Sequence, residues 1–190
     1  MKDYKILIVG VGGQGTLLAS RVLGALAEQK GYDCKLSEVH GMAQRGGSVV
    51  THVVMKDKVY SPIIDEGNAD IILAFEKLEA ARWRHYLKKD GVIVVNNQEI
   101  YPMPVIIGAR EYPQNIIENI KAEGKKIIVI NALDIAKEVG NTRTVNTIMI
   151  GAMAKNLGFT YEEIEKAVSS TVKPKLLAIN LIALKKGYEL

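Results

Sequence analysis

Cysteine is almost absent from this sequence: Cys34 is the one cysteine among 190 residues. No disulfide can form within the chain, and an iron–sulfur cluster held by four cysteines cannot be built from it. A reducing compartment suits such a chain, and we expect a cytoplasmic protein. Also missing are paired-cysteine and H-E-x-x-H motifs for a metal, a G-x-S-x-G elbow for acyl transfer and a G-x-x-x-x-G-K-[ST] loop for a nucleoside triphosphate.

Long hydrophobic runs are missing as well. The apolar stretch LLAINLIAL near the C-terminus is far too short for a bilayer core of about 30 Å. The N-terminal sequence MKDYKILIVG enters a predicted strand without the charged and apolar regions of a signal peptide, so no membrane association is expected. Aromatic residues make up only 6% of the chain and do not interleave with its scattered Lys and Arg residues, which argues against a nucleic-acid partner despite the net charge of +4.

Short β-branched stretches separated by helical patterns are what the sequence has in quantity. Strands are predicted at 5–9, 34–39, 71–75, 92–96 and 127–131, and the length suits a single domain, 1–190. The alternation predicts a three-layer, Rossmann-like α/β fold with a mostly parallel sheet. Near residues 48–62 the sequence SVVTHVVMKDKVYSP alternates with period two around KDK and predicts a hairpin, which would make the sheet mixed.

Helix signals are clear in three places. The first predicted helix ends at Gly31, and a helix rich in small residues ends at Gly158. Thr160 and Glu163 form the capping-box pattern that opens the next helix. The last predicted helix, 175–186, is apolar nearly all round, so it must be buried on several sides, either in this chain's own core or against another subunit.

The stretch ILIVGVGGQGTLLAS places a G-x-G-x-x-G loop between a predicted strand and a predicted helix. The loop contains Gly10, Gly12, Gly13, Gln14 and Gly15. Glycines allow a tight turn and the close approach of a ligand, while the helix N-terminus favours an anion. An NAD site also needs an acidic residue at the end of the second strand, and Glu38 lies there. A free-standing NAD(P)-dependent oxidoreductase or nucleotide-binding module is therefore one alternative.

A second glycine-rich loop follows the second predicted strand. Its candidate site residues are His40, Gly41, Gln44, Arg45, Gly46 and Gly47. The arginine could clamp a phosphate or a carboxylate and the histidine could move protons near neutral pH, but an exposed turn with a surface ion pair is the structural alternative. Both loops should converge at the carboxyl edge of the sheet. Glu76, Asn96 and Asn131 also fall at this edge, where they can equally serve as helix caps.

Several motifs taken together resemble a known family over nearly the whole chain. They are ILIVGVGGQGTLLASRVLGALA, EVHGMAQRGGSVVTHV, SPIIDEGNADIILAFEKLEAAR, GVIVVNN and NTIMIGAMAK. They resemble the gamma-type subunit of 2-oxoacid:ferredoxin oxidoreductases. The HGMAQRGGS form of the second loop is most similar to the small (beta) subunit of the indolepyruvate:ferredoxin oxidoreductase branch.

The resemblance implies a hetero-oligomeric enzyme. Its large subunit would bind thiamine diphosphate and iron–sulfur clusters, decarboxylate indolepyruvate or another arylpyruvate, reduce ferredoxin and release an acyl-CoA. The small subunit would bind none of these cofactors alone and would be inactive by itself. The sequence agrees, because Lys89 stands where a thiamine-diphosphate motif Gly-Asp-Gly has its first glycine, and Asn96-Asn97 follows too soon.

The resemblance assigns no catalytic residue to this chain. We expect the two glycine loops to face the large subunit or its CoA and active-site region. The helix N-terminus, which favours an anion, and the arginine cation lead us to expect polar contacts there from Gln14 and Arg45. A pure scaffold, in which the loops only pack against the partner, remains the simpler alternative.

Overall fold

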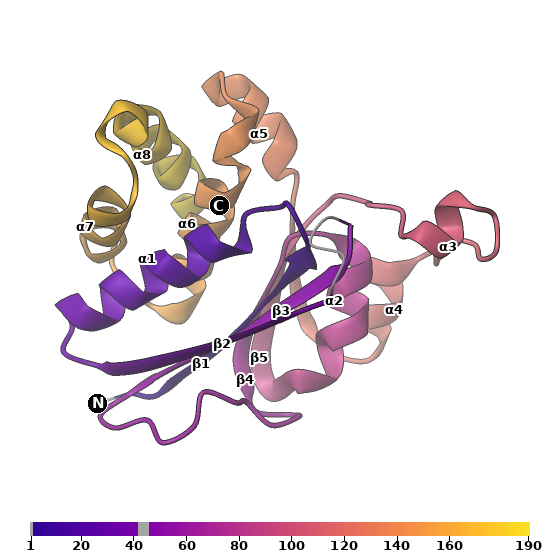
Figure 1. The fold of residues 1–190 in the computed structure, drawn as a ribbon, viewed down its shortest axis with the longest axis horizontal. Coiled ribbons are helices and arrows are strands. Elements are labelled where there is room, and N and C mark those ends of the chain that lie inside the picture. The colour runs from indigo at the N-terminus through magenta and orange to yellow at the C-terminus, as the bar shows by residue number, and fades with distance from the viewer. Residues whose placement is uncertain (1, 42–45) are drawn as a thin grey trace.

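The computed structural model describes residues 2–41 and 46–190, which form one α/β domain (Figure 1). In chain order the elements are β1 (Tyr4–Val11), α1 (Thr16–Gln29), β2 (Asp33–His40), β3 (Ser48–Lys56), β4 (Ala69–Ala74), α2 (Lys77–Trp83), η1 (Arg84–Tyr86), β5 (Leu87–Asn96), α3 (Met103–Ile106), α4 (Ile116–Ala122), β6 (Lys126–Ile130), α5 (Ala132–Val139), η2 (Thr142–Thr144), α6 (Val145–Leu157), α7 (Tyr161–Thr171) and α8 (Pro174–Tyr188). All five predicted strands are present within a few residues of their predicted ends.

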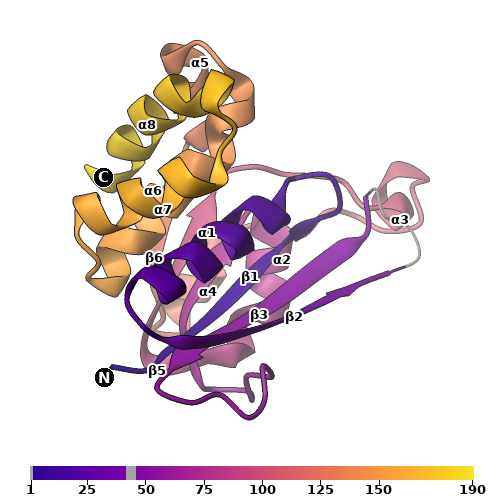
Figure 2. The ribbon, with the colours of Figure 1, turned by 60° about the vertical axis from the view of Figure 1, so that its left-hand side comes forward.

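The described strands form one sheet in the order β2-β3-β1-β4-β5-β6. The strands β1, β4, β5 and β6 pair in parallel, whereas β3 runs antiparallel to both of its neighbours. Helices cover both faces: α1 and α5–α8 lie on one side of the sheet and α2 and α4 on the other (Figures 1 and 2). The predicted three-layer, mixed and mostly parallel architecture is confirmed.

The central strand β1 shows why both faces are covered. Ile6 and Ile8 belong to the hydrophobic cluster beneath α1 and α6, while Leu7 and Val9 belong to the cluster beneath α2 and α4. Successive side chains of a strand point to opposite faces, so a strand that is apolar at every position must be buried on both.

The hairpin predicted near residues 48–62 is wrong in its position. Residues 48–56 form the single strand β3, and no strand follows it before β4. β3 pairs along one side with β1 and along the other with β2, so neither of its edges is free for a returning strand. The antiparallel hairpin is instead β2–β3, and the second glycine loop connects its strands.

The helix ends follow their sequence signals. Gly31 and Gly158 adopt positive φ just after α1 and α6, and the Thr160–Glu163 capping box opens α7. The helix α8 packs against α6 through buried Ala183 and Leu184, while Leu176 and Ile182 are exposed. Among the helices of the described residues, none is long and apolar enough to cross a lipid bilayer.

Candidate functional site

The two glycine loops lie directly against each other at the carboxyl edge of the sheet. The Gly12 N–H donates a hydrogen bond to the Gly47 carbonyl at 2.8 Å, and the Gly46 N–H donates to the Gly12 carbonyl at 3.2 Å. The predicted convergence of the loops is therefore confirmed for these residues. Gln44 and Arg45 lie outside the described residues.

The first loop needs its glycines for physical reasons. Gly13 and Gly15 adopt φ values of 102° and 78°, which side chains disfavour. A Cβ atom at Gly15 would lie 2.2 Å from Nδ2 of Asn146, the atom that donates a hydrogen bond to the Gly15 carbonyl. A Cβ atom at Gly10 would lie 3.2 Å from the Cβ atom of Phe75. The loop is thus held between β4 and the start of α6.

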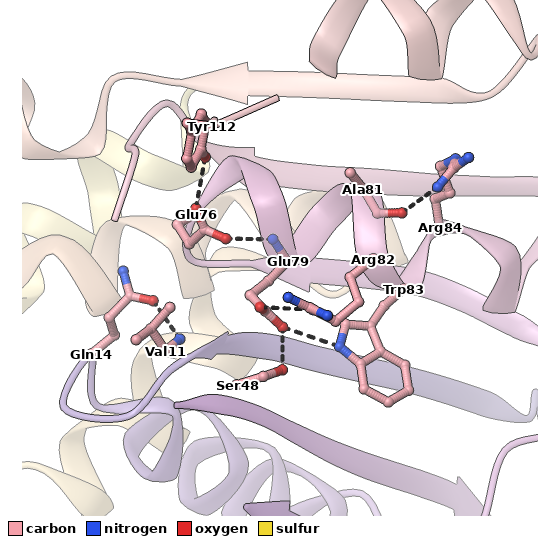
Figure 3. A network of polar contacts seen from close by, with 10 residues as sticks. All are labelled: Val11, Gln14, Ser48, Glu76, Glu79, Ala81, Arg82, Trp83, Arg84 and Tyr112. Atoms are coloured by element: carbon pink, nitrogen blue, oxygen red, sulfur yellow. Dashed lines mark hydrogen bonds and ion pairs between the residues drawn. The ribbon is translucent and has the colours of Figure 1, made fainter. Parts of the chain in front are cut away.

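Gln14 is turned into the protein rather than toward a ligand. Its Oε1 accepts the Val11 N–H at 2.8 Å, and its Nε2 donates to the Phe75 carbonyl at 3.0 Å (Figure 3 shows the Val11 contact). The Nε2 atom also lies 3.4 Å from Oε1 of Gln98. Both amide atoms of Gln14 are thus used within the chain, and the residue shapes the loop; its expected polar contact with a partner stays a prediction.

Two clefts flank the first loop. The first, here called the α6 cleft, has a volume of about 410 Å³ and is lined by Gly13, Gln14, Gly15, Phe75, Gln98, Leu133, Thr142, Arg143, Val145 and Asn146. The second, here called the β2 cleft, has a volume of about 390 Å³ and is lined by Gly12, Gly13, Gly15, Thr16, Leu17, Glu38, His40 and Val49. Both clefts border the N-terminus of α1.

The start of α1 presents free hydrogen-bond donors to these clefts. The N–H groups of Gly13, Gly15 and Thr16 have no acceptor among the described residues. The first N–H groups of any helix lack a partner in the helix itself, and together with the helix dipole they favour a negatively charged group. These unpaired donors are compatible with an anionic ligand, and anion binding at this loop stays a prediction.

The position of Glu38 weakens the dinucleotide alternative. In a Rossmann fold the second strand lies beside the first, which brings its terminal carboxylate to the ribose. Here β3 is inserted between β1 and β2, so Glu38 lies one strand farther out, although it still lines the β2 cleft together with Gly12 and Gly13. Its Oε2 accepts a hydrogen bond from the Thr51 hydroxyl at 3.2 Å. His40, at the end of the same strand, is exposed, with Nδ1 3.1 Å from the carbonyl of Gly41.

The remaining polar residues of the edge serve as caps. Glu76 is the N-cap of α2 and accepts the backbone N–H of Glu79. The side chain of Asn96, at the end of β5, accepts the N–H of Ala132 at 3.2 Å and so caps α5, which follows β6. The side chain of Asn131 accepts a hydrogen bond from the Asn97 side chain at 2.8 Å. These contacts agree with the structural alternative given for Glu76 and Asn96.

The buried carboxylate of Glu79, on α2 close to the N-cap Glu76, was missed by the sequence reasoning. Glu79 accepts hydrogen bonds from Ser48, which follows the second glycine loop, and from Trp83 at 3.1 Å (Figure 3). Glu76 accepts a hydrogen bond from the Tyr112 hydroxyl at 3.1 Å. Burial raises the pKa of the Glu76 carboxyl, and burial beside Glu76 raises that of Tyr112. The one signal in the sequence was the spacing of Glu79, which comes three residues after the capping carboxylate of Glu76.

A family assignment follows from comparison with known proteins. Residues 5–190 match the family described as pyruvate ferredoxin/flavodoxin oxidoreductase. The chain belongs to this family. The resemblance seen in the glycine loops is thereby confirmed over nearly the whole sequence.

Individual relatives refine the family assignment. The chain is 41% identical to the indolepyruvate oxidoreductase subunit IorB of Thermococcus kodakarensis, covering 98% of this chain and 95% of that protein. It also resembles the crystal structure of the keto/oxoacid ferredoxin oxidoreductase gamma subunit of Geobacter sulfurreducens, at 26% identity and a TM-score of 0.72, covering 98% of this chain and 96% of that one.

A larger structure contains the same fold as one part. The 2-oxoglutarate:ferredoxin oxidoreductase of Magnetococcus marinus matches all of this chain with a TM-score of 0.74 and 19% identity, yet the match covers only 31% of that chain. The same fold therefore occurs both as a separate chain and within a longer one.

Cofactor ligands are sparse in this member of the family. Within residues 2–41 and 46–190, no group of three His, Cys, Asp or Glu side chains is arranged to hold a metal ion. Lys89 and Asn96, which stand where a thiamine-diphosphate motif would have a glycine and an asparagine, lie on the single strand β5. Cys34 is a free thiol, and burial raises its pKa to about 11.

Proposed function

We propose that this chain is the small subunit of an indolepyruvate:ferredoxin oxidoreductase. The observation that carries the proposal is the 41% identity to an IorB subunit along almost the full length of both chains. In the proposed reaction an arylpyruvate loses its carboxyl carbon as CO₂, the remaining acyl group forms a thioester with CoA, and the electron pair passes to ferredoxin. The assembly works in the cytoplasm, where a lone thiol such as Cys34 stays reduced.

The chemistry belongs to the partner in this proposal. A large subunit holds thiamine diphosphate and the iron–sulfur clusters, and it carries the decarboxylation and electron transfer. The small subunit supplies a rigid α/β edge that completes the assembly. We expect no turnover from the isolated chain.

The two glycine loops are the surface that we assign to the large subunit and its CoA. The free N–H groups at the start of α1 support an anionic ligand such as a phosphate of CoA. The Magnetococcus relative, which shares the fold, is described with CoA bound. We assign the polar contact with CoA to Arg45, because a guanidinium binds phosphate in a bidentate manner.

Reconstitution tests the proposed function. The chain is coexpressed with the large subunit of the same organism, and ferredoxin reduction is measured with indolepyruvate, phenylpyruvate, pyruvate and 2-oxoglutarate in turn. We expect reduction that needs both subunits and CoA, and that is fastest with an arylpyruvate. Preference for pyruvate would refute the substrate assignment. Calorimetry of the isolated chain with NADH is the second test, and micromolar binding would favour the dinucleotide alternative.

The role of Arg45 can be separated from a pure scaffold. In the reconstituted complex we expect Arg45→Ala to raise the KM for CoA while the subunits still assemble. An unchanged KM together with intact assembly would remove the contact role. Loss of assembly alone would favour the scaffold.

A further inference from the structure

An exposed arm projects from the sheet between β5 and α4. Residues 100–110, here called the α3 arm, carry the single-turn helix α3 at the periphery of the molecule (Figure 1). The whole connection runs over residues 97–115. Connections between a strand and a helix in α/β units commonly need only about 2–6 residues, and much longer ones usually have a function of their own. A much shorter connection could join β5 to α4.

The surface of the arm is apolar. Met103 is 65% exposed, Ile106 63% and Ile107 68%, and Tyr101 is also exposed. No charged residue occurs from position 100 to position 109, in a chain of which 24% is charged. Single exposed apolar side chains are ordinary on a protein surface, but a contiguous group of this kind marks an interaction site.

The arm is anchored at its base. Tyr112 is buried and its hydroxyl donates to the buried carboxylate of Glu76 at 3.1 Å. The Tyr101 ring lies against the Tyr112 ring, with their centroids 5.2 Å apart. Val105 packs against the hydrophobic cluster beneath α2 and α4. The fold thus fixes one side of the arm and leaves Met103, Ile106 and Ile107 facing outward.

The arm starts from the edge that carries the glycine loops. Gln98, just before the arm, lies 3.4 Å from Nε2 of Gln14 and accepts a hydrogen bond from Asn96 at 3.0 Å. A partner seated on the first loop would therefore meet the beginning of the arm. The two surfaces are continuous with each other through this amide cluster.

We propose that the α3 arm docks into an apolar groove of the large subunit and anchors the small subunit to it. The inference rests on the proposed function, which names that partner. In the Magnetococcus relative the matching region is only 31% of its chain, so the remainder of that chain is covalently linked to the same fold. A face that is covered throughout the life of an assembly can be as apolar as an obligate interface.

The test uses the complete chain with its large subunit. The double variant Met103→Asp/Ile107→Asp is compared with Tyr60→Asp/Ile63→Asp, which changes two exposed apolar side chains on the connection between β3 and β4. We expect the arm variant to weaken subunit affinity by about 100-fold or more, because it removes two apolar contacts and places carboxylates in an apolar groove. The control should bind as the unmodified chain does. Thermal melting of each isolated variant shows that it is folded.

The outcomes separate the two proposals. If the unmodified chain binds the large subunit and the arm variant binds within about threefold of it, the arm is not the anchor although the proposed function stands. Equal losses in the control and the arm variant would also overturn the arm. If the unmodified chain binds no large subunit, the proposed function fails and the arm loses its partner. Sedimentation that shows a dimer of the isolated chain, abolished by the arm variant, would assign the arm to a second copy and overturn the proposal.

Discussion

The substitution Gly15→Ala tests whether the first glycine loop is held in shape by α6. The new Cβ atom would lie 2.2 Å from Nδ2 of Asn146, at a backbone position with φ of 78°. A left-handed conformation costs an alanine about 1–2 kcal/mol. Moving the Asn146 amide also breaks its hydrogen bond to the Gly15 carbonyl, which contributes about 0.5–1.5 kcal/mol.

The two costs together are about 1.5–3.5 kcal/mol of unfolding free energy. For a chain of this size, that lowers the melting temperature by roughly 3–14 °C. The assay is urea and thermal unfolding of the isolated chain, followed by circular dichroism. In an Asn146→Ala background the collision is absent, so Gly15→Ala should cost only its backbone strain, about 1–2 kcal/mol.

The double-mutant cycle gives the decisive result. We expect the double variant to be about 1 kcal/mol more stable than the sum of the single costs predicts. Additive costs, within about 0.3 kcal/mol, would show that Asn146 does not constrain the loop, and the reasoning would be refuted.

Three further predictions concern positions outside the loop. Gly187→Ala places a Cβ atom 1.9 Å from a backbone carbonyl of α6 and should destabilise the chain by about 3 kcal/mol in urea unfolding, whereas Gly24→Ala, with open space around it, should not destabilise. Tyr112→Phe leaves the buried Glu76 carboxylate without one donor, so we expect a loss of about 1–3 kcal/mol at neutral pH and faster proteolysis of the α3 arm; unchanged cleavage would show that the anchor is unimportant. Burial lowers the pKa of His52, so the neutral imidazole stabilises the fold fully above the unfolded pKa of about 6.5, and this contribution is lost as the pH falls through the lower folded pKa. Below pH 6.5 we expect the urea midpoint of His52→Gln to decrease with falling pH less steeply than that of the unmodified chain. Identical pH profiles of the two midpoints would contradict this.

The strands and the glycine loop were predictable because their signals are local. A run of apolar residues such as 5–9 is buried on both faces wherever it pairs, and a G-x-G-x-x-G loop before a helix turns in the same way in many folds. The capping box at Thr160 is equally local, since its two hydrogen bonds join residues three positions apart.

The hairpin failed because period-two alternation gives no information on pairing partners. Residues 48–56 alternate as a strand does, but their neighbours in the sheet are β1 and β2, which lie earlier in the chain. The segment after Lys56 therefore could not pair with β3, both of whose edges are occupied. A hairpin prediction from sequence assumes that the nearest strand is the partner, and here the pairing of β3 with β1 broke that assumption.

The sequence by itself determined the class of the fold, the loop that suits an anion and the family. These depend on residue order over short distances, where glycine geometry and side-chain periodicity decide. The tertiary structure alone decided that Gln14 turns inward, that β3 lies between β1 and the strand that carries Glu38, and that Tyr112 meets Glu76. Each of these joins residues distant in the chain, and their contacts exist only after the sheet and its helices have brought them together.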